Sequence, residues 1–131
     1  MKKTKTIGII GQGFVGSAVY EGLKEHYHIQ TYDINLECTQ PDLRSLYWTT
    51  DEIIFLCLPT PMEKDGSCHL GIIEPVLKEL NTFGEKIIVV KSTIPPGTAE
   101  RWNKEYENID IVFNPEFLTE ANSIEDFKNQ N

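Results

Sequence analysis

A glycine-rich loop directly after the first apolar segment constrains the fold more than any other feature of the sequence. Residues 5–10 are largely apolar, as expected for a buried strand, and the next six residues read Gly11-Gln12-Gly13-Phe14-Val15-Gly16. Three glycines at this spacing permit a tight turn, a close backbone approach to a bound group, and close packing of a helix on the strand. Apolar residues then recur with a helical period over Phe14–Tyr27. The sequence therefore predicts a strand, a glycine turn and a helix in immediate succession.

An acidic residue follows this turn at the distance expected for a dinucleotide-binding unit. Asp33 ends a second predicted strand, Ile29–Asp33, and lies 22 residues after Gly11. The helix N-terminus offers free amides to a diphosphate, and the carboxylate accepts hydrogen bonds from ribose hydroxyls while repelling a 2′-phosphate. Because Ile34 and Asn35 supply no cation for such a phosphate, the pattern favours NAD over NADP. The cofactor-binding residues predicted from this unit are Gly11, Gly13, Phe14, Val15, Gly16 and Asp33.

The rest of the chain alternates apolar stretches with helical patterns. The further predicted strands are Ile53–Leu58, Lys86–Lys91 and Ile109–Phe113, and the further predicted helices are Pro41–Trp48, residues 70–82 and Gly97–Tyr106. Strands that alternate with helices imply right-handed crossovers and a parallel sheet. We therefore expect residues 1–131 to form one α/β domain, a Rossmann-like, doubly wound parallel sheet of five to six strands.

Charge and composition exclude several classes of function. The 131 residues include 20 acidic and 12 basic ones, which gives a net charge of −8. So acidic a chain repels phosphate backbones, which argues against nucleic-acid binding. The longest apolar run, Ile53–Leu58, is too short to span a membrane, and the N-terminus lacks the pattern of a secretory signal. Three cysteines without metal-ligand spacing predict no metal site and fit reduced thiols in a cytoplasmic protein.

Polar loops follow three of the predicted strands. Thr60 lies between two prolines after the third strand, and Ser92 and Thr93 follow the fourth. Carboxyl ends of parallel strands meet at one edge of the sheet, where ligands bind, so we expect these three residues to contact the cofactor. Glu116 and Glu120 follow the fifth strand four residues apart, and would share one face of a helical turn. We expect both carboxylates to point to this edge, near Thr93.

These loops resemble those of the N-terminal domain of the UDP-glucose/GDP-mannose 6-dehydrogenase family. The resemblance spans nearly the whole chain and rests on the runs GQGFVG, TYDIN, CLPTP, KSTIPPGT and NPEFLTE, among which CLPTP, STIPPGT and NPEFL are quite specific. Members oxidise the primary alcohol of a nucleotide sugar twice, with two NAD, to a uronic acid, and a cysteine captures the intermediate aldehyde. The resemblance implies that Thr93, Glu116 and Glu120 lie near the nicotinamide and the hydrolytic water, where a carboxylate is suited to activating that water.

The sequence departs from the family in places that matter for catalysis. The family's nucleophilic cysteine and catalytic lysine lie in regions that this sequence does not contain, and none of Cys38, Cys57 and Cys68 has matching surroundings. Only 19 residues separate Asp33 from Ile53, where the family usually has a much longer insert. We therefore expect a domain that binds NAD but does not turn over a nucleotide sugar alone, since the sugar would need the missing half.

Two other functions remain open at the level of the sequence. One is an NAD-dependent dehydrogenase of the β-hydroxyacid type, which shares the glycine loop, although the usual glycine-rich substrate loop of that class is not evident. The other is a non-catalytic NAD-sensing module, with which the absence of the cysteine and the lysine is compatible. The sequence identifies neither the sugar nor the oligomeric state.

Overall fold

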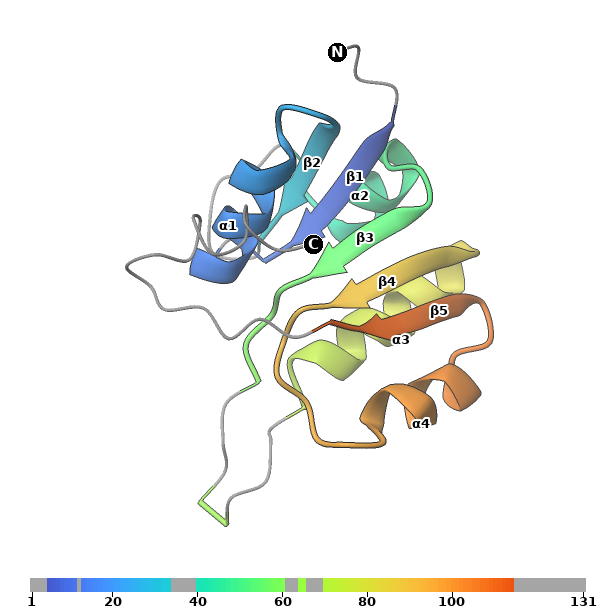
Figure 1. Ribbon diagram of the computed structural model, residues 1–131. Helices are drawn as coiled ribbons and strands as arrows, with labels where there is room; N and C mark the ends of the chain where they lie inside the picture. Colours follow the sequence, from blue (N-terminus) through green and yellow to red (C-terminus); the bar gives the residue numbers. More distant parts are fainter. Residues whose placement is uncertain (1–4, 12, 34–39, 61–63, 66–69, 115–131) are drawn as a thin grey trace.

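Five parallel strands form the centre of the protein in a computed structural model that describes residues 5–11, 13–33, 40–60, 64–65 and 70–114 (Figure 1). The strands are β1 (Thr6–Ile10), β2 (His28–Tyr32), β3 (Ile53–Leu56), β4 (Lys86–Val90) and β5 (Ile109–Phe113). They lie in the order β2-β1-β3-β4-β5, and each neighbouring pair is parallel. The first strand, β1, therefore lies second from one edge of the sheet, and the direction of winding reverses between β1 and β3. This arrangement confirms the predicted Rossmann-like α/β fold.

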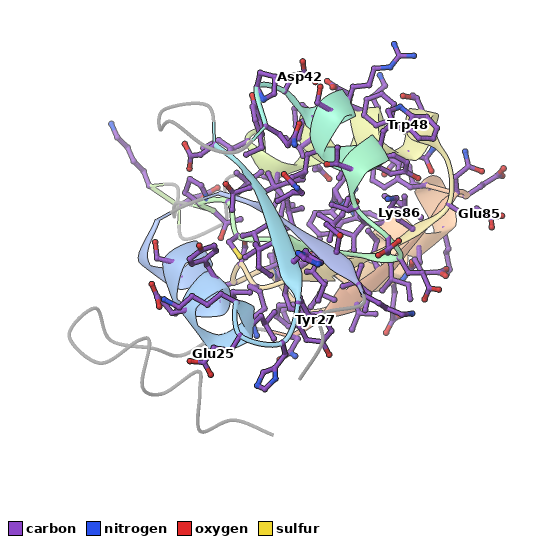
Figure 2. All side chains as sticks on the ribbon, turned by 90° about the horizontal axis from the view of Figure 1, so that it is seen from above. Glu25, Tyr27, Asp42, Trp48, Glu85 and Lys86 are labelled. Carbon is purple, nitrogen blue, oxygen red and sulfur yellow. The ribbon has the colours of Figure 1, made fainter. Side chains whose placement is uncertain are left out.

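In the described part of the chain four helices connect the strands, and each confirms a predicted one with slightly different bounds. They are α1 (Phe14–Leu23), α2 (Leu43–Thr49), α3 (Ile73–Phe83) and α4 (Thr98–Glu105). The prediction that the first helix continues to Tyr27 is wrong, because the amides of His26 and Tyr27 both bond to the Leu23 carbonyl and close a turn. Figure 2 shows Glu25 and Tyr27 at this turn. Strand β3 also ends early, at Leu56, two residues before the end of the predicted strand.

One hydrophobic core lies between the sheet and the helices α2, α3 and α4. Alternate strand residues point into it, among them Ile54, Leu56 and Ile88, which are fully buried. On the opposite face, Ile7 and Ile9 of β1 are buried where α1 packs against that strand. Helices therefore cover both faces of the sheet, which is the doubly wound arrangement expected from the sequence.

The short segment between β2 and β3 still places a helix on the sheet. Asp42 caps α2, because its side chain accepts a hydrogen bond of 2.8 Å from the Ser45 amide. That hydrogen bond lowers the pKa of the Asp42 carboxyl. Leu43, Leu46 and Tyr47 of this helix are buried in the core. The segment from residue 33 to residue 52 is thus long enough to complete the crossover from β2 to β3.

A single carboxylate ties α3 to α4. One oxygen of Glu74 accepts hydrogen bonds from the indole nitrogen of Trp102, at 2.8 Å, and from the guanidinium of Arg101, at 2.7 Å. Burial alone would raise the pKa of Glu74, but these two hydrogen bonds and the charge of Arg101 outweigh it and hold the pKa below its ordinary value. The ionised form of Glu74 is therefore the one that stabilises the contact between the two helices.

We expect Glu74→Gln to destabilise the domain by about 1–2 kcal/mol near neutral pH, since Trp102 and Arg101 lose a charged acceptor. A carboxyl with a depressed pKa stabilises the fold above its unfolded-state pKa, and this contribution is lost as the pH falls through the folded-state value. The stability difference between the two proteins should therefore shrink below about pH 4. Urea denaturation at neutral and at acid pH measures it.

The matched control for this prediction is Glu21→Gln. Glu21 pairs with Lys24 three residues away on the partly exposed surface of α1, so its loss should leave the free energy of unfolding unchanged. If Glu74→Gln lowered stability equally at both pH values, the charge of Glu74 would not be the source of the effect.

Candidate functional site

Gly11 lies at the carboxyl edge of the sheet, at the point where the winding reverses. Its amide donates a hydrogen bond of 2.8 Å to the Tyr32 carbonyl at the end of β2. Its φ is +96°, and a Cβ on this residue would lie 2.5 Å from the Cys57 carbonyl oxygen after β3. Both the backbone conformation and the neighbouring strand therefore require glycine here, as the glycine pattern predicts. Ligands of open parallel sheets bind at such a reversal.

The N-terminus of α1 opens beside Gly11. Gly13 precedes the helix as its N-cap and is exposed, and a Cβ on it would meet nothing within 4 Å. Among the described residues, no side chain caps this helix end and no acidic residue lies in the first turn. Val15 is half-buried and Gly16 is buried, and the side chain of Phe14 lies outside the described part. The first-turn amides are thus placed to receive an anion.

A cavity of about 510 Å³ opens beside Asp33, directly after β2. Its wall is mostly apolar and comes from the carboxyl ends of three strands and from α2 and α3. The lining residues are Ile10, Tyr32, Asp33, Leu43, Leu58, Pro59, Ile72, Val76 and Glu79. Such a size and lining suit the flat, mostly apolar ring system of a ligand whose polar part meets the carboxylate.

The residues of this wall that come from helices were not predicted as part of the site. Leu43, Ile72 and Val76 occur in helical patterns, where an apolar residue is ordinarily assigned to the core. In the structure Ile72 precedes the first turn of α3 and is 39% exposed, which its apolar character in the sequence does not indicate. Its proximity to Asp33 depends on how the helices cross the sheet.

The loops after β3 and β4 lie together, as expected for neighbouring parallel strands. The Thr60 hydroxyl donates a hydrogen bond of 2.6 Å to the Thr93 carbonyl, and the Ser92 hydroxyl donates one to the Leu58 carbonyl. The side chain of Thr93 is exposed at the same edge. The structure thus brings Thr60, Ser92 and Thr93 together, and their contact with the cofactor stays a prediction.

Cys57 follows β3 and is a partly buried thiol. Burial raises its pKa to about 12, although the nearby positive charge of Lys91 acts in the opposite direction. Burial likewise lowers the pKa of Lys91, which is only 2% exposed. A thiol with so high a pKa is protonated at neutral pH and is a poor nucleophile, which agrees with the absence of a predicted covalent role.

Several predicted features fall outside the part of the chain that the structure describes. These are Glu116 and Glu120, whose expected position near Thr93 stays a prediction, and the cysteines Cys38 and Cys68. Within residues 5–11, 13–33, 40–60, 64–65 and 70–114 there is no group of three or more His, Cys, Asp or Glu placed to hold a metal ion. No helix in these ranges is long and apolar enough to cross a membrane.

Some known proteins are similar to this chain in sequence, and a solved structure is similar to it in fold. UDP-glucose 6-dehydrogenase TuaD of Bacillus subtilis is 34% identical over 121 residues, which cover 85% of this chain and 26% of that protein. UDP-glucose 6-dehydrogenase AglM of Haloferax volcanii is 30% identical, over 92% of this chain and 38% of that protein. A solved UDP-glucose dehydrogenase from Pyrobaculum islandicum has the same fold, with a TM-score of 0.79 and 24% identity, over 95% of this chain and 38% of that one.

The family relation covers most of the chain. This chain spans well under half the length of each relative named above. Residues 19–131 match the sequence profile described as the UDP-glucose/GDP-mannose dehydrogenase family, NAD binding domain. The glycine turn precedes the first matched residue, and it lies between β1 and α1 as a Rossmann fold requires. The chain belongs to the UDP-glucose/GDP-mannose dehydrogenase family, as its NAD-binding domain.

Proposed function

We propose that the domain holds NAD across the carboxyl edge of its sheet, with the diphosphate at the N-terminus of α1 and the adenosine beside Asp33. The observation that carries this proposal is the apolar cavity next to the Asp33 carboxylate. Ile10 and Tyr32 line that cavity, and Gly11 both follows Ile10 and bonds to Tyr32. Base, ribose and diphosphate sites would therefore follow one another along the edge.

Each part of the cofactor then meets a suitable group. The adenine ring would occupy the cavity, against side chains such as Leu58, Ile72 and Val76. The Asp33 carboxylate would accept hydrogen bonds from the ribose hydroxyls, and the first-turn amides of α1 would face the diphosphate. The nicotinamide half would extend over the loops after β3 and β4, toward Thr93. When bound, the nicotinamide supplies the acceptor for a hydride.

For the whole protein to which such a domain belongs, we propose oxidation of a nucleotide sugar of the UDP-glucose or GDP-mannose type. The names of TuaD and AglM support this substrate class. Thr93, Glu116 and Glu120 would lie near the reacting carbon by the family resemblance, and a glutamate would activate the hydrolytic water. The 131 residues alone would not complete the reaction, since the high pKa of Cys57 leaves it unsuited to capture an aldehyde.

Calorimetry of the chain with NAD and with NADP tests the cofactor assignment. We expect NAD to bind at least about tenfold more tightly, because the Asp33 carboxylate repels a 2′-phosphate. Asp33→Ala should weaken NAD binding by about tenfold and narrow the difference between the cofactors, since two hydrogen bonds to a charged acceptor are lost.

The matched control is Asp110→Ala. It removes the same charge from an exposed position on β5 and should leave both affinities unchanged. Equal or tighter binding of NADP to the unmodified chain would contradict the assignment of Asp33 to the ribose.

A further inference from the structure

Two side-chain hydrogen bonds run in opposite directions between the loops that follow β3 and β4. The Thr60 hydroxyl reaches the Thr93 carbonyl at 2.6 Å, and the Ser92 hydroxyl reaches the Leu58 carbonyl. The residues joined are 33 and 34 positions apart in the sequence. Each loop therefore both donates to and accepts from the other, and we call this pair of bonds the loop brace.

The loop brace lies directly beyond the paired residues of β3 and β4. The strands β3 and β4 are in register up to Leu56 and Val90, and the Lys91 amide makes one more bond, of 2.9 Å, to the Leu56 carbonyl. Beyond this point side-chain hydroxyls donate hydrogen bonds from one loop to the other. Ser92, one of these two donors, is buried, at 9% exposure.

We propose that Thr60 and Ser92 are positioning residues of the NAD site, which hold the two loops at the spacing that the nicotinamide half requires. This inference rests on the function proposed above. A hydroxyl has one proton to donate, and in both residues a loop carbonyl accepts it. Thr60 and Ser92 therefore act on the cofactor through the backbone that they fix and not as donors to it.

The two bonds hold different parts of the site. Ser92 fixes the carbonyl of Leu58, whose side chain lines the cavity beside Asp33. Thr60 fixes the backbone of Thr93, whose own side chain is exposed at the edge of the sheet. Ordering these loops in advance lowers the entropy that a ligand must remove on binding. Because each bond holds a different part of the site, the losses caused by removing each of them should combine.

Calorimetric titrations with NAD and with ADP distinguish an effect on the nicotinamide half from an effect on the binding of any ligand at this site. ADP contains the adenosine and the diphosphate and lacks the nicotinamide half. We expect Thr60→Val and Ser92→Ala each to weaken NAD binding about threefold, and the double variant at least about tenfold, while the affinity for ADP stays within about twofold. Thr60→Ser keeps the hydroxyl and should restore the affinity for NAD. Thermal unfolding of each variant verifies that it is folded.

Thr82→Val is the matched control, since the Thr82 hydroxyl also donates to a backbone carbonyl, that of Glu79 in α3, at 2.6 Å. Its affinities should equal those of the unmodified chain. The positioning role is overturned if the double variant binds NAD normally, or if NAD and ADP weaken equally. Failure of the unmodified chain to bind either ligand would instead overturn the proposed function, and the positioning role with it.

Discussion

Replacing Gly11 with alanine is expected to lower the free energy of unfolding by about 3 kcal/mol or more, because two independent penalties combine. The residue has a φ of +96°, which an L side chain rarely adopts. In addition, the new Cβ would lie 2.5 Å from the Cys57 carbonyl oxygen and 2.9 Å from its carbon. The backbone of Cys57 cannot move away from the new methyl group freely, since the Cys57 amide is bonded to the Ile10 carbonyl at 2.8 Å. Urea denaturation followed by circular dichroism measures the loss.

Gly13→Ala is the matched control, because the same atom is added two residues further along the same turn. Gly13 has a φ of −68°, and its Cβ would have no atom within 4 Å, so stability should change by less than about 0.5 kcal/mol. Binding of NAD should nevertheless weaken by about tenfold, since a methyl group would stand between the first-turn amides and the diphosphate. Comparable unfolding free energies for both variants would contradict the structural role of Gly11.

Features that depend on local patterns were predictable from the sequence. Strands and helices followed from apolar periodicity, and the parallel sheet followed from their alternation, so the carboxyl ends of the strands could be expected at one edge. The place of Gly11 was predictable for the same reason, because the constraint on its φ comes from the turn that it makes. Asp33 could be placed beside this turn from the length of one strand–helix–strand unit.

Features that depend on contacts between distant segments were not predictable in this way. That Thr60 and Ser92 reside in neighbouring loops follows from the topology, but no local pattern in the sequence specifies which carbonyls their hydroxyls reach. The cavity beside Asp33 depends on how α2 and α3 cross the sheet, which no periodicity in either helix specifies. The contacts of Lys86 were not predictable either, since its partner Thr50 lies 36 residues earlier in the chain.

Lys86 begins β4 and reaches back to the C-terminal end of α2 (Figure 2). Its ammonium nitrogen donates to the carbonyls of Tyr47 and Thr50, both at 2.6 Å, and to the Thr50 hydroxyl at 2.8 Å. It also lies 4.4 Å from the centre of the Tyr47 ring, which packs against Phe83. Partial burial lowers the pKa of this lysine. A cation at this position adds hydrogen bonds to carbonyls at the C-terminal end of a helix and interacts favourably with the helix dipole.

Lys86→Met is therefore expected to destabilise the domain by about 2 kcal/mol, although the side chain keeps nearly the same length and apolar volume. The loss of three hydrogen bonds and of the contact with the Tyr47 ring exceeds what is regained by no longer burying a charge. Lys78→Met serves as the control, since Lys78 is exposed on α3 and its loss should change the unfolding free energy by less than about 0.5 kcal/mol. Chemical denaturation of both variants provides the comparison. Equal stability of the two would show that α2 is held by its buried apolar residues alone, and that the ammonium group contributes nothing to its position.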